Sequence, residues 1–255
     1  MIPIRDVNPS FRRPWVTWAI IAAAVYVFFA LQPRAPATAS EFAYRYAAIP
    51  CEITTGQPLS RDEVRGGPCS ADPEERPVFP DKPVFATLLA SMFLHAGLLH
   101  LIGNMWSLWI FGNNIEDGYG RLGYFLLYVV SGLVASLAHV LLRPESTVPV
   151  VGASGAIAGV MGSYLVLFPL ASVVTIIPVF LFPWVVAVPA WIFLALWFLG
   201  QFFIAAQATS IAWEAHVAGF VFGMVATLLF SALLRRRIRR HRLARAARIS
   251  PNLRF

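Results

Sequence analysis

Long runs of apolar residues without charged side chains alternate with polar segments along this chain. A helix that crosses a bilayer needs about 20 mostly apolar residues. We expect six such helices, over residues 15–32, 97–114, 121–141, 151–168, 186–206 and 213–234. A polar segment, residues 34–82, separates the first two and holds eight acidic and six basic residues. The pattern predicts an all-α integral membrane protein, a bundle of six transmembrane helices with one long outer loop.

The number of helices depends on one uncharged run, Ser146–Trp213, which extends for 68 residues. The run has room for two or three crossings, and its prolines favour a break between about 168 and 185. Arginine-rich ends stay in the cytoplasm. Three arginines lie in residues 1–14 and nine between Arg235 and Arg254. Both termini are then cytoplasmic, which requires an even number of crossings and favours six over seven.

This topology divides the chain into a cytoplasmic N-terminus (1–14), a membrane domain (15–234) and a basic cytoplasmic tail (235–255). The first apolar run also resembles a secretory signal peptide. Its 17 residues from Trp15 to Leu31 exceed the 7–15 of such a peptide's apolar region, so we favour a retained helix. Cleavage would leave the later topology unchanged.

Composition agrees with a membrane protein, because 58% of the residues are hydrophobic and only 13% are charged. A soluble domain carries about 25% charged residues. The net charge of +7 is concentrated in the tail. A basic segment beside a membrane helix is typical of contact with anionic lipid, which we favour over nucleic acid as its partner.

The two cysteines, Cys51 and Cys69, both lie in the polar segment. A segment outside the cytoplasm permits a disulfide between them. A reduced pair is the alternative, and the sequence leaves both open.

Four polar residues lie near the starts of three expected helices. His100 and Asn104 are four residues apart, on one face of the second helix, and Ser154 and His216 lie in the first turns of the fourth and sixth. These three helices run in the same direction, so the side chains share one shallow layer on the outer side. Polar side chains within a bilayer are costly and indicate function.

Two glycine pairs indicate that the fourth and sixth helices touch. Gly155 and Gly159 are four residues apart, and so are Gly219 and Gly223. Small residues at this spacing let membrane helices approach closely. Such an approach would bring Ser154 and His216 within reach of each other, although packing alone would also explain the glycines.

A serine beside a histidine is typical of nucleophilic catalysis, because the imidazole can take the hydroxyl proton. A carboxylate usually orients the histidine. Here Glu214 is only two residues from His216 and points elsewhere on a helix, so we expect a Ser–His dyad. Backbone N–H groups at the start of the fourth helix could stabilise an oxyanion.

The motifs "HAGLLHLIGN", "GASGAIAG" and "AHVAGFVFG" resemble those of the rhomboid intramembrane serine proteases over roughly residues 85–223. The resemblance implies that Ser154 is the nucleophile and His216 the general base. It also implies that His100, Asn104 and the Ser154 backbone N–H stabilise the oxyanion. We accordingly expect cleavage of single-pass membrane proteins, without a metal or other cofactor, in the inner membrane of a bacterial cell.

Two other functions are alternatives to proteolysis. A non-catalytic rhomboid-like protein that binds transmembrane helices would be expected to lack Ser154 or His216, and both are present. A transporter would more often carry a buried acidic or basic residue for coupling, and the predicted polar layer has none.

Overall fold

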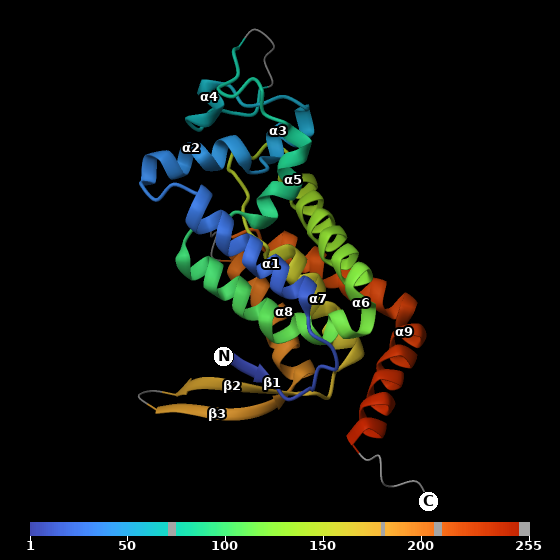
Figure 1. Ribbon diagram of the computed structural model, residues 1–255. Helices are drawn as coiled ribbons and strands as arrows, with labels where there is room; N and C mark the ends of the chain where they lie inside the picture. Colours follow the sequence, from blue (N-terminus) through green and yellow to red (C-terminus); the bar gives the residue numbers. More distant parts are fainter. Residues whose placement is uncertain (71–74, 180–181, 207–210, 250–255) are drawn as a thin grey trace, which may run out of the picture.

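The computed structural model describes residues 1–70, 75–179, 182–206 and 211–249 (Figure 1). Helices dominate, and the predicted helical class holds for most of the chain. The helices are α1 (Trp15–Tyr26), continued by the π-helical turn η1 (Val27–Leu31), α2 (Pro36–Tyr46), α3 (Pro50–Thr55), α4 (Arg61–Val64), the 3-10 turn η2 (Val84–Ala86), α5 (Thr87–Ala90), the 3-10 turn η3 (Ser91–Phe93), α6 (Leu98–Leu142), α7 (Ser154–Leu167), α8 (Ala190–Ala206) and α9 (Trp213–Ile249).

Two of these helices are long and apolar enough to cross a membrane, α6 and the part of α9 up to Ala244. Only 33% of the most apolar stretch of α6 and 28% of that of α9 is buried, so much of their apolar surface faces outward. A core helix of a soluble protein would instead be mostly buried. The shorter helices α1 with η1, α7 and α8 are also apolar.

The expected helices 97–114 and 121–141 form one helical segment, α6, with a break at its centre. Gly120 has φ 72° and ψ 169°, which is not helical. Glycine adopts a positive φ without steric penalty. The Arg237 guanidinium from α9 fills the space where a Cβ of Gly120 would lie, and its Nη1 donates to the Tyr119 carbonyl at 3.0 Å. The chain therefore reverses here without a separate loop.

A small antiparallel sheet corrects the all-α prediction. Its strands are β1 (Ile2–Asp6), β2 (Ser172–Val179) and β3 (Phe182–Pro189), in the order β1-β2-β3. The sheet lies at the end of the bundle where α9 ends, at the bottom of Figure 1. Residues 186–189, expected at the start of a helix, belong to β3, and the helix begins at Ala190. Runs of Val and Ile favour strands where prolines prevent helix.

Two carboxylates at the turn of α6 anchor the start of α1. Glu116 accepts hydrogen bonds from the Thr17 backbone N–H and hydroxyl, both at 2.9 Å, and Asp117 accepts one from the Arg12 N–H at 3.0 Å. The first N–H groups of a helix lack partners within the helix, and negative charge is favourable there. These buried acidic residues thus serve the packing of α1 on α6.

The polar segment forms a folded cap, residues 36–70 and 75–82, at the opposite end of the bundle (Figure 1). Cys51 and Cys69 are joined by a disulfide, which answers the question left open by the sequence. A buried ion pair between Lys82 and Glu52 lies close by. Burial raises the pKa of Glu52, whereas the ion pair with Lys82 opposes that shift.

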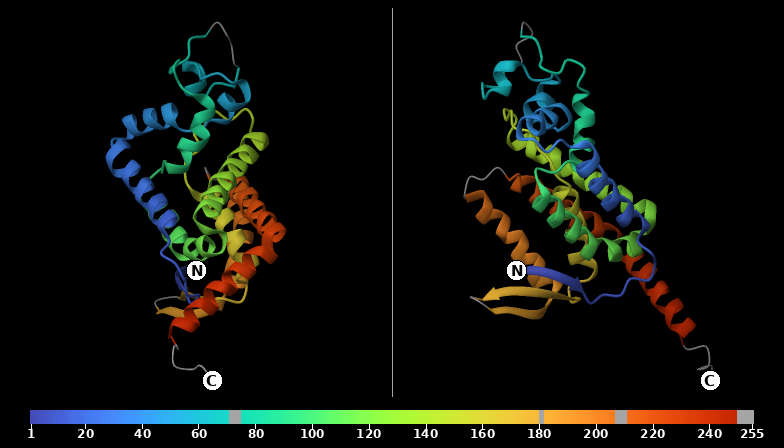
Figure 2. Two further views of the ribbon diagram at one scale, coloured as in Figure 1. Left: turned by 45° about the vertical axis from the view of Figure 1, so that its right-hand side comes forward. Right: turned by 60° about the vertical axis from the view of Figure 1, so that its left-hand side comes forward.

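The core is built around α7, which lies between α6 and α9 (Figure 2). Every residue from Gly155 to Tyr164 is buried. Large aromatic and aliphatic side chains of α6 belong to the same core cluster, among them Leu108, Phe111, Ile115, Tyr124 and Tyr128. Glycines of α7 allow both neighbours to approach its backbone, Gly155 and Gly159 towards α6 and Gly162 towards α9.

Candidate active site

Ser154 and His216 meet at the starts of two neighbouring helices. Ser154 is the first residue of α7, and His216 lies in the first turn of α9. The Ser154 Oγ lies 2.7 Å from the His216 Nε2, although 62 residues separate the two in sequence. This distance is that of a hydrogen bond. A histidine must be within hydrogen-bonding distance of a serine hydroxyl to accept its proton.

Glycines on both helices make this contact possible. A Cβ on Gly219 would collide with the Gly155 carbonyl, and one on Gly223 with the Gly159 carbonyl. A Cβ on Gly155 would meet Ala135 of α6, and one on Gly159 would meet Ser131 of α6. All four glycines singled out in the sequence therefore lie at close helix contacts. Backbone-to-backbone packing brings the start of α9 onto the start of α7.

His100 lies beside the serine, across a glycine with an unusual backbone. Gly152 has φ +128°, and a Cβ there would lie 2.8 Å from His100 Cε1 and 3.6 Å from the Ser154 Oγ. The Gly152 N–H donates to the Ser91 carbonyl at 2.9 Å, which holds the loop in place. His100 is thus in the same cluster as Ser154 and His216.

Asn104 lies one helical turn after His100 on α6 and is 7% exposed. No described residue accepts a hydrogen bond from its Nδ2. A buried amide donor without a partner is energetically unfavourable and often belongs to a functional site. Asn104 therefore retains a donor that a bound oxyanion could use.

The second nitrogen of His216 has a partner that the sequence did not predict. The Nδ1 lies 2.7 Å from the Oε1 of Gln201, which is on α8. The Trp197 ring, also on α8, packs on the imidazole with centroids 6.0 Å apart. Gln201 carried the same signal as the other site residues, since it is a polar side chain inside an uncharged run.

Among the described residues no carboxylate is hydrogen-bonded to His216. Glu214 instead pairs with Arg143, at 2.9 Å, and with His139, whose Nδ1 lies 3.4 Å from its Oε2. His139, in the last turn of α6, thus has a structural partner in Glu214 of α9. His95 packs edge-on against His100 at 5.2 Å, and its backbone is hydrogen-bonded to the Gln32 side chain.

The cap contacts the loop that leads into the serine. Cys51 N–H donates to the Ser146 carbonyl at 3.0 Å, and Val150 N–H donates to the Ala48 carbonyl at 2.8 Å. The Ser91 hydroxyl accepts from the Ala48 N–H at 2.6 Å. Ser91 therefore connects the cap and the Gly152 loop.

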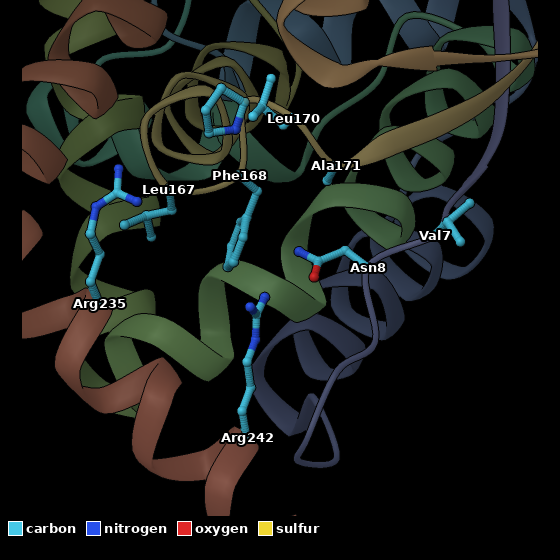
Figure 3. A pocket seen from close by; sticks show the side chains of 9 residues that line it. Val7, Asn8, Leu167, Phe168, Leu170, Ala171, Arg235 and Arg242 are labelled. Carbon is cyan, nitrogen blue, oxygen red and sulfur yellow. The ribbon is translucent and has the colours of Figure 1, made fainter.

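A separate cavity lies at the other end of α7 (Figure 3). Its volume is about 330 Å³, and it is bordered by Phe168 and Leu170 with Arg235 and Arg242 of α9 nearby. Neither Ser154 nor His216 lines this cavity. Candidate metal ligands in the described residues are Cys51, Glu63 and Cys69. Because the two sulfurs are bonded to each other, they offer no thiolate to a metal.

Comparison with known proteins identifies the family to which this chain belongs. The chain matches the Rhomboid domain over residues 82–233, more than half of its length. It is 33% identical over 144 residues to Rhomboid protein 1, mitochondrial, of Saccharomyces cerevisiae, covering 54% of this chain and 40% of that protein. It is 38% identical over 78 residues to Rhomboid protease GluP of Bacillus subtilis, covering 31% of this chain and 15% of that protein.

A further relative is RHOMBOID-like protein 6, mitochondrial, of Arabidopsis thaliana, with 41% identity over 78 residues, 31% of this chain and 25% of that protein. These alignments thus span between 15% and 40% of the relatives' own lengths. The domain match includes α6, α7 and α8, and it continues into α9 to residue 233. The chain is a helical membrane protein of the rhomboid family.

Proposed function

We propose that this protein is an intramembrane serine protease that cleaves transmembrane segments of other membrane proteins. Ser154 is the nucleophile and His216 the general base. The observation that carries the proposal is the 2.7 Å hydrogen bond between Ser154 Oγ and His216 Nε2. Membership of a family that includes a relative named a rhomboid protease supports it.

The reaction follows from this pair. His216 Nε2 takes the Ser154 proton as the Oγ attacks the scissile carbonyl carbon. The peptide C–N bond then breaks, and His216 returns the proton to the amine that leaves. Water attacks the remaining ester while His216 again accepts a proton. His216 returns this proton to the Ser154 Oγ as the ester bond between Oγ and the carbonyl carbon breaks. The new carboxyl terminus is then released and the free serine is restored.

The tetrahedral intermediate carries a negative oxygen that needs donors. We assign this role to the Ser154 backbone N–H, His100 and the Asn104 amide. The unpartnered Nδ2 of Asn104 and the contact of His100 with Gly152 support the assignment. The start of α7 adds the positive end of a helix dipole.

The proposed topology has six crossings. They are α1 with η1, the two halves of α6 on either side of Gly120, α7, α8 and the apolar part of α9. Residues 1–14 and 235–255 then lie in the cytoplasm, 15–234 form the membrane domain, and the disulfide-bonded cap lies outside. We place the protein in the inner membrane of a bacterial cell. The arginine-rich end of α9 supports this orientation.

Single-pass membrane proteins are the proposed substrates, and membrane lipid surrounds the apolar helices. Apolar side chains exposed along α9, among them Leu228, Leu229 and Phe230, support contact with lipid. The arginines beyond Leu234 fit anionic headgroups, so we assign no nucleic-acid partner to the tail.

The deciding experiment measures fluorophosphonate labelling and cleavage of a reporter transmembrane segment by the purified protein. Ser154→Ala and His216→Ala should each lower cleavage by at least about a thousandfold, as loss of a nucleophile or base does. Ser107→Ala is the matched control, because among the described residues this hydroxyl bonds only the Gly103 carbonyl of its own helix, in an exposed hydrogen bond. A folded protein that neither labels nor cleaves would instead favour a non-catalytic protein that binds transmembrane helices.

A further inference from the structure

Gln201 is a buried polar residue in the middle of the apolar helix α8. Its side chain is 4% exposed and makes two hydrogen bonds. The Nε2 donates to the Trp197 carbonyl at 3.0 Å, one turn earlier on the same helix. The Oε1 lies 2.7 Å from the His216 Nδ1. Gln201 therefore connects a backbone carbonyl of α8 to the imidazole of α9.

The first of these bonds determines which way the amide is turned. A backbone carbonyl can only accept, so the group facing Trp197 must be the NH₂ group. The oxygen of the amide then faces His216. An amide oxygen also can only accept, so His216 Nδ1 must carry a hydrogen and donate it.

This hydrogen decides the chemistry of the other imidazole nitrogen. A neutral imidazole with a hydrogen on Nδ1 has a free electron pair on Nε2. The Nε2 is the atom that lies 2.7 Å from the Ser154 Oγ. The serine hydroxyl therefore donates to Nε2, which is the starting arrangement for transfer of its proton.

We propose that Gln201 is a positioning residue that holds His216 in the tautomer and ring orientation that accepts the Ser154 proton. The inference rests on the proposed protease function. It assigns to a neutral amide the part that a carboxylate plays in a Ser–His–Asp triad. An amide can do this inside an apolar span without burying a second charge, which would be costly there.

Among the described residues, none of the other charged or titratable groups around His216 is bonded to its Nδ1, so the positioning role belongs to Gln201. His100 faces the site from α6, beside Gly152 and Ser154. Glu214 precedes His216 on α9, but its carboxylate is paired with His139 of α6 and with Arg143, which directly follows α6. From α8 come the Trp197 ring and Gln201 itself.

Three variants of α8 separate a positioning role from a structural one. Gln201→Leu keeps the volume and removes the acceptor. Gln201→Glu keeps an oxygen at the acceptor position and adds charge. Phe203→Leu is the control, because this side chain is 74% exposed on the same helix. Each is compared with the wild type for kcat, KM and the pH dependence of reporter cleavage, and for thermal unfolding.

Loss of the hydrogen bond should lower kcat of Gln201→Leu about ten- to a hundredfold with little change in KM. Gln201→Glu should retain more of kcat than Gln201→Leu. A carboxylate at this position would stabilise the protonated imidazole of His216. On acidification, Gln201→Glu should therefore lose cleavage activity at a higher pH than the wild type does. Phe203→Leu should match the wild type in kcat, KM, the pH dependence of cleavage and thermal unfolding.

Wild-type kcat and an unchanged pH profile in Gln201→Leu would overturn the positioning role. So would an equal loss of kcat in both Gln201 variants, with the wild-type pH profile and a lowered unfolding temperature, since that pattern belongs to packing alone. Absence of cleavage and labelling in the wild type would instead reject the proposed protease function. The two failures are therefore distinguishable.

Discussion

At the scale of single residues, Gly152 links three parts of the site. Its positive φ of +128° is accessible to glycine, and its missing side chain leaves room for His100. Its N–H is bonded to Ser91, which also holds Ala48 of the cap. Gly152 is therefore needed both for its positive φ and for the close approach of the His100 ring.

Gly152→Ala should lower cleavage by at least about tenfold, because the new Cβ costs about 1–2 kcal/mol of backbone strain and displaces His100. Reporter cleavage and probe labelling measure the effect. Gly97→Ala is the matched control, since Gly97 has an extended backbone with φ 179° and a Cβ there would meet no described atom within 4 Å beyond its chain neighbours. Equal activity of the two variants would contradict the role of Gly152.

At the scale of elements, the Asp6 carboxylate joins β1 to both α6 and α7. Asp6 Oδ2 accepts hydrogen bonds from the Tyr164 hydroxyl and the Asn114 Nδ2, both at 2.7 Å. Burial raises the pKa of Asp6 from 3.8 to about 6, against the opposing effect of the Tyr164 hydrogen bond. The folded protein therefore binds a proton at Asp6 more tightly than the unfolded chain does.

The sign of the pH dependence follows from linkage. Between pH 4 and 6 the folded state holds more protons at Asp6 than the unfolded state, so stability from this group falls as pH rises. Asp6→Asn removes this contribution and keeps an oxygen acceptor. The unfolding temperature of the wild type minus that of Asp6→Asn should become more negative from pH 4 to pH 7. A constant difference across this range would contradict the shifted pKa.

At the scale of the whole molecule, the cap and the helical bundle meet at the loop before Ser154. The Cys51–Cys69 disulfide closes a segment with a sequence separation of 18 residues, and the Cys51 N–H is bonded to Ser146 of that loop. A cross-link of this length contributes about 3 kcal/mol by restricting the unfolded chain. Stability of the cap is thus coupled to the position of the loop.

Replacement of both Cys51 and Cys69 by serine should make the cap more susceptible to limited proteolysis and slow the labelling of Ser154. The physical reason is the loss of a cross-link next to the bonds at Ser146 and Val150. A reductant should have the same effect on the wild type and none on the double variant. Labelling at the wild-type rate with an open cap would show that the cap does not support the loop.

The sequence by itself determined the helical membrane class and the candidate site residues. Uncharged apolar runs need no tertiary information to be recognised, because the bilayer acts on each segment separately. Ser154, His216, His100 and Asn104 stood out because polar side chains are rare in such runs. The GxxxG spacing likewise predicted the surface on which α7 and α9 meet, since it depends on the helix period alone.

Tertiary structure decided the features that depend on contacts between distant residues. The partner of His216 is 15 positions away on another helix, and no spacing rule selects Gln201 for it. The sheet required β1 to pair with β2, which begins more than 160 residues later. Helix α6 breaks at Gly120, whose positive φ needs no side chain, and Arg237 of α9 fills the space left by the missing Cβ. A local sequence pattern reflects whether a segment prefers lipid or water. These contacts form only when the folded chain brings distant segments together.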